Sequence, residues 1–421
     1  MTASLHVGSA IATFPIPTGT PLAGYMARTE PSSGTLDDLE IGVVALSVTP
    51  GQLVVVSVDV VGVDAALRDD LADATGIPAD TLLLAATHTH SGPSGLIPRL
   101  HPAEGDTLNA ELRARFLTVA AATIRSALDA LRPATLSHET MRASGSWSNR
   151  NNPDGPVDDR IRLLIARDGA ERVATILALH PCHPTILGAE STVVSADLVG
   201  GLRQALRAQF GTDQVVVLTG AAGDISTRFT RHASTPAEIT RLAMRATSER
   251  GGEHAIAATT ITHVTQTTRL PSALAMSDVE PETELAAARS AWEHATREAL
   301  PPADIRRALT RYQGAQIRMR LRDIPQTRFD VTLGAWTLGP ELAIVTIPGE
   351  LFTSLGQRIE AASPFAQTWV VGYTNSYVGY LVDAEAELAR TYEAMASPFG
   401  TGAGERIVDV ATSLLGERAN Q

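Results

Sequence analysis

The chain contains short, almost uninterrupted runs of apolar and β-branched residues, separated by segments with helical periodicity. Runs of this length are typical of strands that are covered on both faces of a sheet. Their alternation with helical segments predicts an α/β protein in which a mixed β-sheet core is covered by helices. The clearest strand candidates are Gly42–Thr49, Leu53–Val61, Leu82–Thr87, Arg160–Ala166, Val173–Leu179 and Val215–Thr219.

Other segments carry the periodicity of helices. One runs from Leu108 to Leu131 and stops at a proline, and another runs from Leu198 to Phe210 and is closed by a glycine. Proline lacks a backbone donor and glycine adopts the left-handed conformation, so both residues end helices. Toward the C-terminus we expect strands at Phe329–Leu338 and Leu342–Thr346, and helices at Thr353–Ala361 and around Ile407–Leu415.

A charged, alanine-rich stretch between about residues 280 and 318 is interrupted at Pro301-Pro302. Because a proline pair breaks a helical pattern, this stretch predicts a helical hairpin that projects from the sheet. No internal repeat or obvious linker divides the rest of the sequence. We therefore expect one large domain over residues 1–421 with a helical excursion.

Composition and charge narrow the functional classes. The 421 residues are 44% apolar and 19% charged, as in folded globular proteins. The net charge is -12 without a long basic run, which argues against a nucleic-acid partner because such binding needs clustered Lys and Arg. The single cysteine, Cys182, leaves no intrachain disulfide and is expected to be a small buried hydrophobe.

The N-terminal residues lack the basic and apolar regions of a secretion signal, and no apolar stretch approaches the length of a membrane span. A cytoplasmic location without stable membrane insertion is the resulting expectation. The sequence does not indicate an oligomeric state.

Two histidines, His88 and His90, follow directly after the apolar run Leu82–Ala86. Side chains at positions i and i+2 of an extended segment point the same way, so both imidazoles are expected to enter one cavity at a strand end. Imidazole binds metal ions and transfers protons, and either role fits such a pair. A pair of polar residues at a surface turn is the alternative.

Four further strand ends carry reactive side chains beside glycine or proline. Loops at the carboxyl ends of strands are where α/β proteins build sites, because rigid strands direct several side chains to one point. The segments are Leu179–Thr185 with His180 and His183, Thr219–Ser226 with a glycine-rich turn before Ser226, Ile347–Glu350, and Asn375–Tyr380.

Each of these residues has a structural alternative. Buried histidines often serve only as hydrogen-bonding groups, and Glu350 has the sequence of a first helical turn, where proline and glutamate are favoured. Ser226 is a candidate helix N-cap, and the turn before it is a candidate phosphate cradle, although no lysine follows it as a P-loop requires. Tyr380 is a candidate core aromatic.

The order of the motifs resembles the neutral/alkaline (non-lysosomal) ceramidase family over nearly the whole chain. The resemblance is carried by Gly24-Tyr25, Val58-Asp59, Thr87-His88-Thr89-His90-Ser91-Gly92-Pro93, Asn149-Arg150, Cys182-His183-Pro184-Thr185, Ser195-Ala196-Asp197, Gly223-Asp224-Ile225-Ser226, Pro348-Gly349-Glu350, Asn375-Ser376-Tyr377-Val378-Gly379-Tyr380 and Tyr392-Glu393.

This resemblance implies a zinc site and a small-molecule N-acyl amide as substrate. The metal ligands that it implies are His88, His183, Glu350 and Tyr380. It also implies that four residues surround the scissile amide, namely His90, Arg150, Tyr392 and Ser226.

The implied chemistry is hydrolysis of an amide by a zinc-activated water, with the zinc also polarising the carbonyl. Arg150, Tyr392 and His90 would stabilise the oxyanion or protonate the departing nitrogen. Ser226 would position the substrate or act as a nucleophile. Zinc should remain bound after Ser226→Ala and be lost when His88 or Glu350 is replaced.

Two departures from the family pattern limit the expectation about substrate. The ceramidases carry a further β-rich domain after the catalytic part, which we expect to be absent here, and they have a proline where this chain has Thr227. A smaller, more polar N-acyl compound than ceramide is therefore one expectation. A metal-independent serine esterase or amidase and a non-catalytic binding protein on the same scaffold stay open as alternatives.

Overall fold

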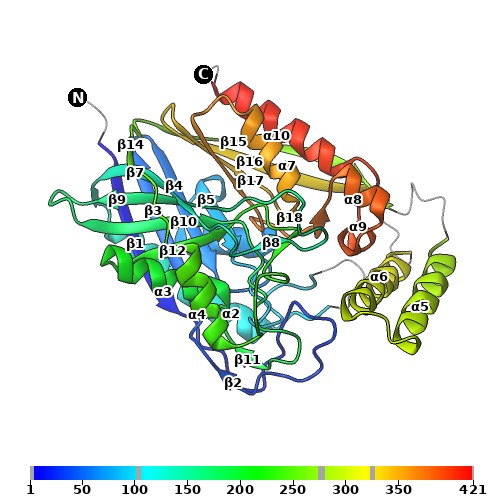
Figure 1. Ribbon diagram of the computed structural model, residues 1–421. Helices are drawn as coiled ribbons and strands as arrows, with labels where there is room; N and C mark the ends of the chain where they lie inside the picture. Colours follow the sequence, from blue (N-terminus) through cyan, green and yellow to red (C-terminus); the bar gives the residue numbers. More distant parts are fainter. Residues whose placement is uncertain (1–3, 101–105, 274–279, 323–327, 420–421) are drawn as a thin grey trace.

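Three β-sheets form the centre of the computed structural model, which describes residues 4–100, 106–273, 280–322 and 328–419 (Figure 1). The first sheet has the strand order β5-β4-β3-β1-β6, with antiparallel pairs except for the parallel pair of β4 and β5. Its strands are β1 (His6–Thr13), β3 (Glu40–Val48), β4 (Gly51–Val58), β5 (Leu82–Ala86) and β6 (Arg132–Pro133).

The second and third sheets also combine antiparallel and parallel pairs. The second has the order β12-β10-β9-β7-β14 and the third the order β15-β16-β17-β19, with β10 parallel to β12 and β17 parallel to β19. Their strands are β7 (Thr135–Arg142), β9 (Arg160–Arg167), β10 (Val173–His180), β12 (Val215–Thr219), β14 (His254–Ile256), β15 (Ile261–Pro271), β16 (Arg328–Leu338), β17 (Leu342–Thr346) and β19 (Gln367–Val371).

One apolar interior is shared by all three sheets. Val55 of the first sheet, Leu177 of the second and Trp336 of the third belong to the same buried cluster. The alternate residues of β4, such as Val54 and Val56, face the other way and pack in a second cluster. Because both faces of these strands are buried, their sequences lack the polar alternation of a half-exposed sheet.

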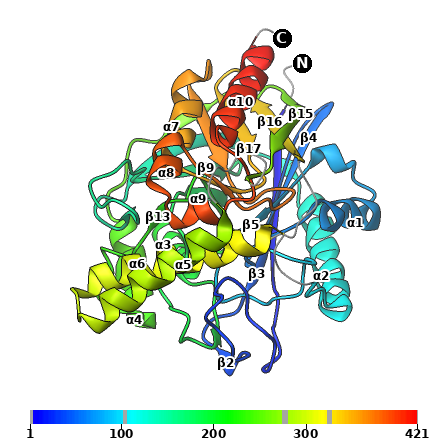
Figure 2. The same ribbon diagram turned by 90° about the vertical axis from the view of Figure 1, so that its right-hand side faces the viewer.

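Helices cover the outer faces of the sheets (Figures 1 and 2). The first sheet is covered by α1 (Ala65–Thr75) and α2 (Ala110–Asp129), and the second by α3 (Leu198–Phe210) and α4 (Pro236–Ala246). The third is covered by α7 (Thr353–Ala362) and α10 (Ala403–Ala419). The expected α/β architecture with a helix-covered mixed core is confirmed.

Local sequence explains where these helices begin and end. Asp64 and Asn109 accept hydrogen bonds from backbone N–H groups in the first turns of α1 and α2, and so satisfy donors that the helix leaves free. Gly76 and Gly211 end α1 and α3 in the left-handed conformation.

The helical excursion lies where the proline pair places it. Helices α5 (Pro281–Arg297) and α6 (Pro302–Leu321) pack against each other and stand apart from the sheets (Figure 1). The buried carboxylate of Glu284 pairs with Arg318 and with Arg390, which caps the short helix α8 (Ala384–Ala389). Helix α6 also packs on α9 (Tyr392–Ala396). The hairpin is therefore fixed to the body of the protein.

Three two-stranded ladders complete the fold, and the sequence patterns did not predict any of them. They are β2 (Gly34–Thr35) with β11 (Val193–Val194), β8 (Ser148–Asn149) with β13 (Ile225–Ser226), and β18 (Glu350–Leu351) with β20 (Tyr380–Leu381). Each strand is two residues long, so it leaves no periodic pattern. Two of these ladders hold residues of the candidate site.

Replacing a fully buried aromatic residue tests the packing of the first sheet. Phe116 of α2 is completely buried and meets Phe14 edge-on with ring centroids 5.7 Å apart. Phe116→Ala is expected to lower the free energy of unfolding by about 3–5 kcal/mol, because the cavity does not collapse fully. Urea denaturation measures this loss. Leu388→Ala, at an exposed site, is the control and should change it by less than about 0.5 kcal/mol.

Candidate metal centre and adjoining pocket

The carboxyl ends of strands from all three sheets meet at one place. The backbone N–H of Gly372, after β19, donates to the carbonyl of Thr219 at the end of β12, at 2.9 Å. The N–H of Ala86, at the end of β5, donates to the carbonyl of Tyr373 at 3.0 Å. These bonds join the sheets at the edge where the loops with the candidate residues begin.

His88 lies two residues beyond the end of β5, and its backbone has a positive φ of 65°. The expected extended geometry of the His88–His90 segment is therefore wrong, because a turn rather than strand alternation brings the two rings together. The Nδ1 atom lies 2.6 Å from the carbonyl oxygen of Val61, and the ring stacks on Tyr373 with centroids 4.2 Å apart. The buried imidazole is thus held in one orientation.

His183 is held in the same way at the end of β10. Its Nδ1 lies 2.6 Å from the carbonyl oxygen of Ala222, and its ring is fully buried. The Nε2 atom lies 2.9 Å from Oε2 of Glu350, which is itself 3.3 Å from Nε2 of His88. Glu350 lies in β18 rather than in a first helical turn, so the helical alternative for this residue is wrong.

The hydrogen-bond partners of these three atoms are compatible with a cation between them. A carbonyl oxygen only accepts, so both histidines carry their proton on Nδ1 and present a lone pair on Nε2. Two lone pairs then face the same carboxylate oxygen. Either additional protons or a metal ion must lie between them, and burial followed by the charge of Arg150 lowers the pKa of His183 to about 4. The arrangement is one that could hold a metal ion.

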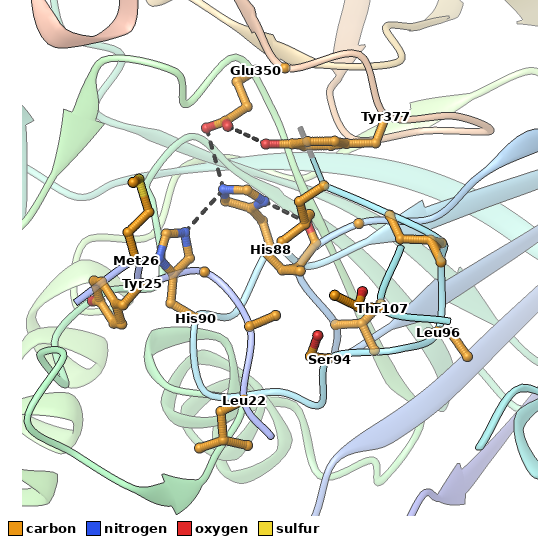
Figure 3. A pocket seen from close by; sticks show the side chains of 18 of the residues that line it. Leu22, Tyr25, Met26, His88, His90, Ser94, Leu96, Thr107, Glu350 and Tyr377 are labelled. Atoms are coloured by element: carbon orange, nitrogen blue, oxygen red, sulfur yellow. Dashed lines mark hydrogen bonds and ion pairs between the residues drawn. The ribbon is translucent and has the colours of Figure 1, made fainter. Parts of the chain in front are cut away.

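His90 adds a further nitrogen to this group (Figure 3). Its Nε2 lies 3.2 Å from Nε2 of His88, and the candidate ligand atoms of His88, His90 and His183 all lie within 4.8 Å of one another. The ring packs edge-on against Tyr25, and Gly24 is tight against it, since a Cβ there would lie 2.5 Å from the ring. The three histidines, of which His88 and His183 are buried and His90 is partly exposed, form a cluster that can hold a metal ion.

Tyr380 and Arg150 lie beside the cluster. Tyr380 is in register with Glu350 in the β18–β20 ladder, and its hydroxyl accepts a hydrogen bond from Nη2 of Arg150 at 3.1 Å. Nε of Arg150 donates to Oε1 of Glu393 at 2.7 Å. Tyr392 faces Tyr380 with ring centroids 6.1 Å apart. The structure therefore brings together three of the residues that the resemblance assigned to ligation and catalysis.

Ser226 lies in β13, which pairs with β8 just before Arg150, so it is not a helix N-cap. Its Oγ accepts a hydrogen bond from the N–H of Arg228 at 3.2 Å. Among the residues that the structure describes, its hydroxyl has no hydrogen bond to an imidazole. Ser226 and the histidines are therefore not joined by a direct hydrogen bond in the described residues.

Two residues of the site escaped the sequence prediction. Tyr377 donates a hydrogen bond from its hydroxyl to Oε1 of Glu350, and Glu393 accepts from both Arg150 and Asn151. Both belong to motifs that carried the resemblance. Their roles depend on contacts between segments far apart in the sequence, so no local pattern identifies them.

His180 belongs to the second pair of histidines but lies apart from the cluster. Burial, followed by the charge of His183, lowers its pKa from 6.5 to about 3. Below about pH 6.5 the unfolded chain takes up a proton that the folded chain takes up only near pH 3. The folded protein is therefore expected to lose stability as the pH falls through this window.

His180→Phe removes this titration. Its free energy of unfolding should decline less than that of the wild type between about pH 6.5 and pH 4, measured by urea denaturation at each pH. His232→Phe, at an exposed position, is the control and should follow the wild type. Equal declines in all three proteins would contradict the assignment.

A cavity of about 370 Å³ opens beside the cluster (Figure 3). Five candidate site residues line it: His88, His90, Glu350, Tyr380 and Tyr392. His183, Arg150 and Ser226 are not among its described lining residues. The cluster is thus buried in the protein on one side and open to a bound molecule on the other.

The fold and the site together define a three-sheet α/β protein with a buried histidine–carboxylate cluster at its strand ends. No protein-family model matches the chain, and no curated protein sequence matches it. Its structure is similar to the crystal structure of neutral ceramidase from Pseudomonas aeruginosa, with a TM-score of 0.73 and 16% identity over 99% of this chain and 75% of that one. A structure of a ceramidase complexed with C2 gives the same TM-score and identity and is covered to 76%. The chain therefore has a ceramidase-like fold.

The helices of the described residues are too short or too polar to cross a bilayer.

Proposed function

We propose that this chain is a zinc-dependent hydrolase that cleaves the amide bond of an N-acyl compound. The observation that carries the proposal is the convergence of two imidazole nitrogens on one carboxylate oxygen. Oε2 of Glu350 lies 2.9 Å from Nε2 of His183 and 3.3 Å from Nε2 of His88. The ceramidase-like fold supports the choice of an amide as the bond that is cleaved.

The donor set fits zinc. Zinc takes nitrogen and oxygen ligands at about 2.0–2.2 Å, so donor atoms about 3 Å apart could share one ion. The Nε2 atoms of His88 and His183 and the Oε2 atom of Glu350 would hold the ion, and Tyr380 would supply the fourth protein donor. When bound, zinc supplies an activated water and a Lewis acid for the carbonyl.

The remaining residues would act on the substrate. His90 is kept neutral because burial, followed by the neighbouring imidazoles of His88 and His183, holds its pKa well below the ordinary value. It would accept the proton of the attacking water and return it to the departing nitrogen. Arg150 and Tyr392 would stabilise the developing oxyanion, and Ser226 would position the substrate.

Metal analysis combined with an activity screen tests this proposal. Purified protein is expected to contain zinc and to hydrolyse members of a panel of N-acyl amines, N-acyl amino acids and ceramides. Chelation should remove zinc and activity together, and zinc should restore both. Activity that survives complete removal of zinc would favour a metal-independent serine esterase or amidase. A protein that binds these compounds without cleaving them would be a non-catalytic binding protein.

Ser226→Ala separates the two roles of the serine. The variant should keep its zinc and lose only part of its turnover, and Ser248→Ala, at an exposed site, should match the wild type. Full turnover of the Ser226→Ala variant would show that the hydroxyl takes no part in the reaction.

A further inference from the structure

Part of the cavity wall is buried and apolar, and part is exposed and polar. Buried apolar side chains line its interior, including those of Leu22, Leu96, Ile97 and Ile317. The polar residues Asp106, Thr107 and Arg320 line it where they are exposed to solvent. Such a cavity suits a hydrocarbon group inside and a polar group at the mouth.

One wall of the cavity is formed by helix α6 of the hairpin together with helix α9, on which α6 packs. Ile317 and Arg320 lie on α6, and Tyr392 and Ala396 lie on α9. Ile317 forms a buried cluster with Leu321 and Ala396, against which Tyr380 and Tyr392 pack. The hairpin thus contacts the same tyrosines that adjoin the metal cluster.

The helices α6 and α9 approach each other closely. A Cβ at Gly314 of α6 would lie 2.7 Å from Cε and 3.1 Å from Cβ of Met395. Glu284 of α5 also pairs with Arg318 of α6 and with Arg390 at the end of α8. The wall is therefore a fixed boundary of the cavity rather than a loose cover.

The size of the cavity limits what it encloses. Its volume of about 370 Å³ lies at the lower end of the roughly 300–1,000 Å³ that is typical of small-molecule pockets. A compact molecule fills such a space, whereas a long hydrocarbon chain must leave it and expose its apolar surface to water. Methylenes outside the cavity are exposed to water in the free and in the bound substrate alike, so a long chain is disfavoured only where the fixed wall blocks its path.

We propose that the α5–α6 hairpin sets the acyl-chain length of the substrate, and that Ile317 is the residue of its wall that excludes long chains. The preferred substrates are compact N-acyl amides with a short acyl group inside the cavity and a polar amine portion at its mouth. This inference rests on the proposed amide hydrolysis.

A series of amides that share one polar amine and differ only in acyl length tests the inference. For the wild type, kcat/KM is expected to fall by about tenfold or more between acyl groups of about eight and about sixteen carbons. Ile317→Ala should move this fall toward longer chains, and Ile317→Phe should move it toward shorter ones. The matched control is Ile305→Ala, which removes the same atoms from α6 at a position that does not line the cavity.

The outcomes distinguish the two proposals. Equal kcat/KM for short and long chains in the wild type, or the same length profile for Ile317→Ala and Ile305→Ala, would overturn the inference. If no amide of any length is cleaved, the proposed function fails. In that case the binding affinities of the same compounds, measured by calorimetry, still show whether short acyl chains are preferred. They also show whether Ile317→Ala, and not Ile305→Ala, improves the binding of long chains.

Discussion

Replacing Glu350 by glutamine is expected to abolish both zinc binding and amide hydrolysis. The carboxylate is the negative group of the cluster and lies against His88 and His183. Burial would raise its pKa, but the adjacent imidazoles of His88 and His183 hold it well below the ordinary value, so the group is ionised. A neutral amide in its place removes the charge that balances a divalent ion.

The expected loss of kcat/KM is on the order of 10³-fold or more, since the activated water and the carbonyl polarisation disappear together. Metal analysis of the purified variant should show a zinc content far below that of the wild type. Tyr377→Phe provides a graded control, because it keeps the carboxylate and removes only the hydroxyl that donates to it. That variant should lose about 10–100-fold in zinc affinity. A Glu350→Gln variant with full zinc and full turnover would rule out this metal centre.

Replacing Glu393 by alanine is expected to weaken both the fold and the reaction. Arg150 is 9% exposed and Glu393 only 2%, so the pair is buried. Burial alone would lower the pKa of Arg150, but the charges of Tyr380 and Glu393 outweigh it and hold the pKa well above the ordinary value. Without Glu393 the guanidinium is a buried charge that lacks its carboxylate, which costs about 3–5 kcal/mol.

The same pair orients Arg150 toward Tyr380, so the variant should also lose about 10²-fold in kcat if the guanidinium stabilises the oxyanion. Urea denaturation and steady-state kinetics measure the two effects. Glu417→Ala removes an exposed carboxylate and should change stability by less than about 0.5 kcal/mol.

A double-mutant cycle separates the pair from its parts. The double variant Arg150→Met with Glu393→Leu should be more stable than the sum of the single losses predicts, because neither charge is left buried alone. Strict additivity of the three unfolding free energies would show that the two side chains do not interact.

Local sequence predicted the central strands and helices because their signals lie within a few residues. The run Leu82–Ala86 is apolar at every position, and the structure buries both of its faces. The helix ending before Gly211 and the hairpin broken at the proline pair were also located correctly. By contrast, β7 (Thr135–Arg142) was not among the expected strands, since polar residues occupy six of its eight positions.

The site was harder to predict because its geometry arises between segments. Adjacency in the sequence identified His88 and His90, but the reason given for their convergence was wrong, since His88 adopts a left-handed turn. The pairing of Glu350 with Tyr380 depends on a ladder of two residues per strand. The contacts of Tyr377 and Glu393 depend on packing between distant segments.

The sequence by itself determined which residue types stand at the strand ends, because hydrophobic patterning and helix-ending residues act over short distances. Only the tertiary structure decided which of those residues meet. The three sheets share one interior, and this packing brings Nε2 of His88 and Nε2 of His183 within 3.3 Å of Oε2 of Glu350. The hairpin likewise became a wall of the cavity only through its packing on α9, a contact between elements that no local pattern encodes.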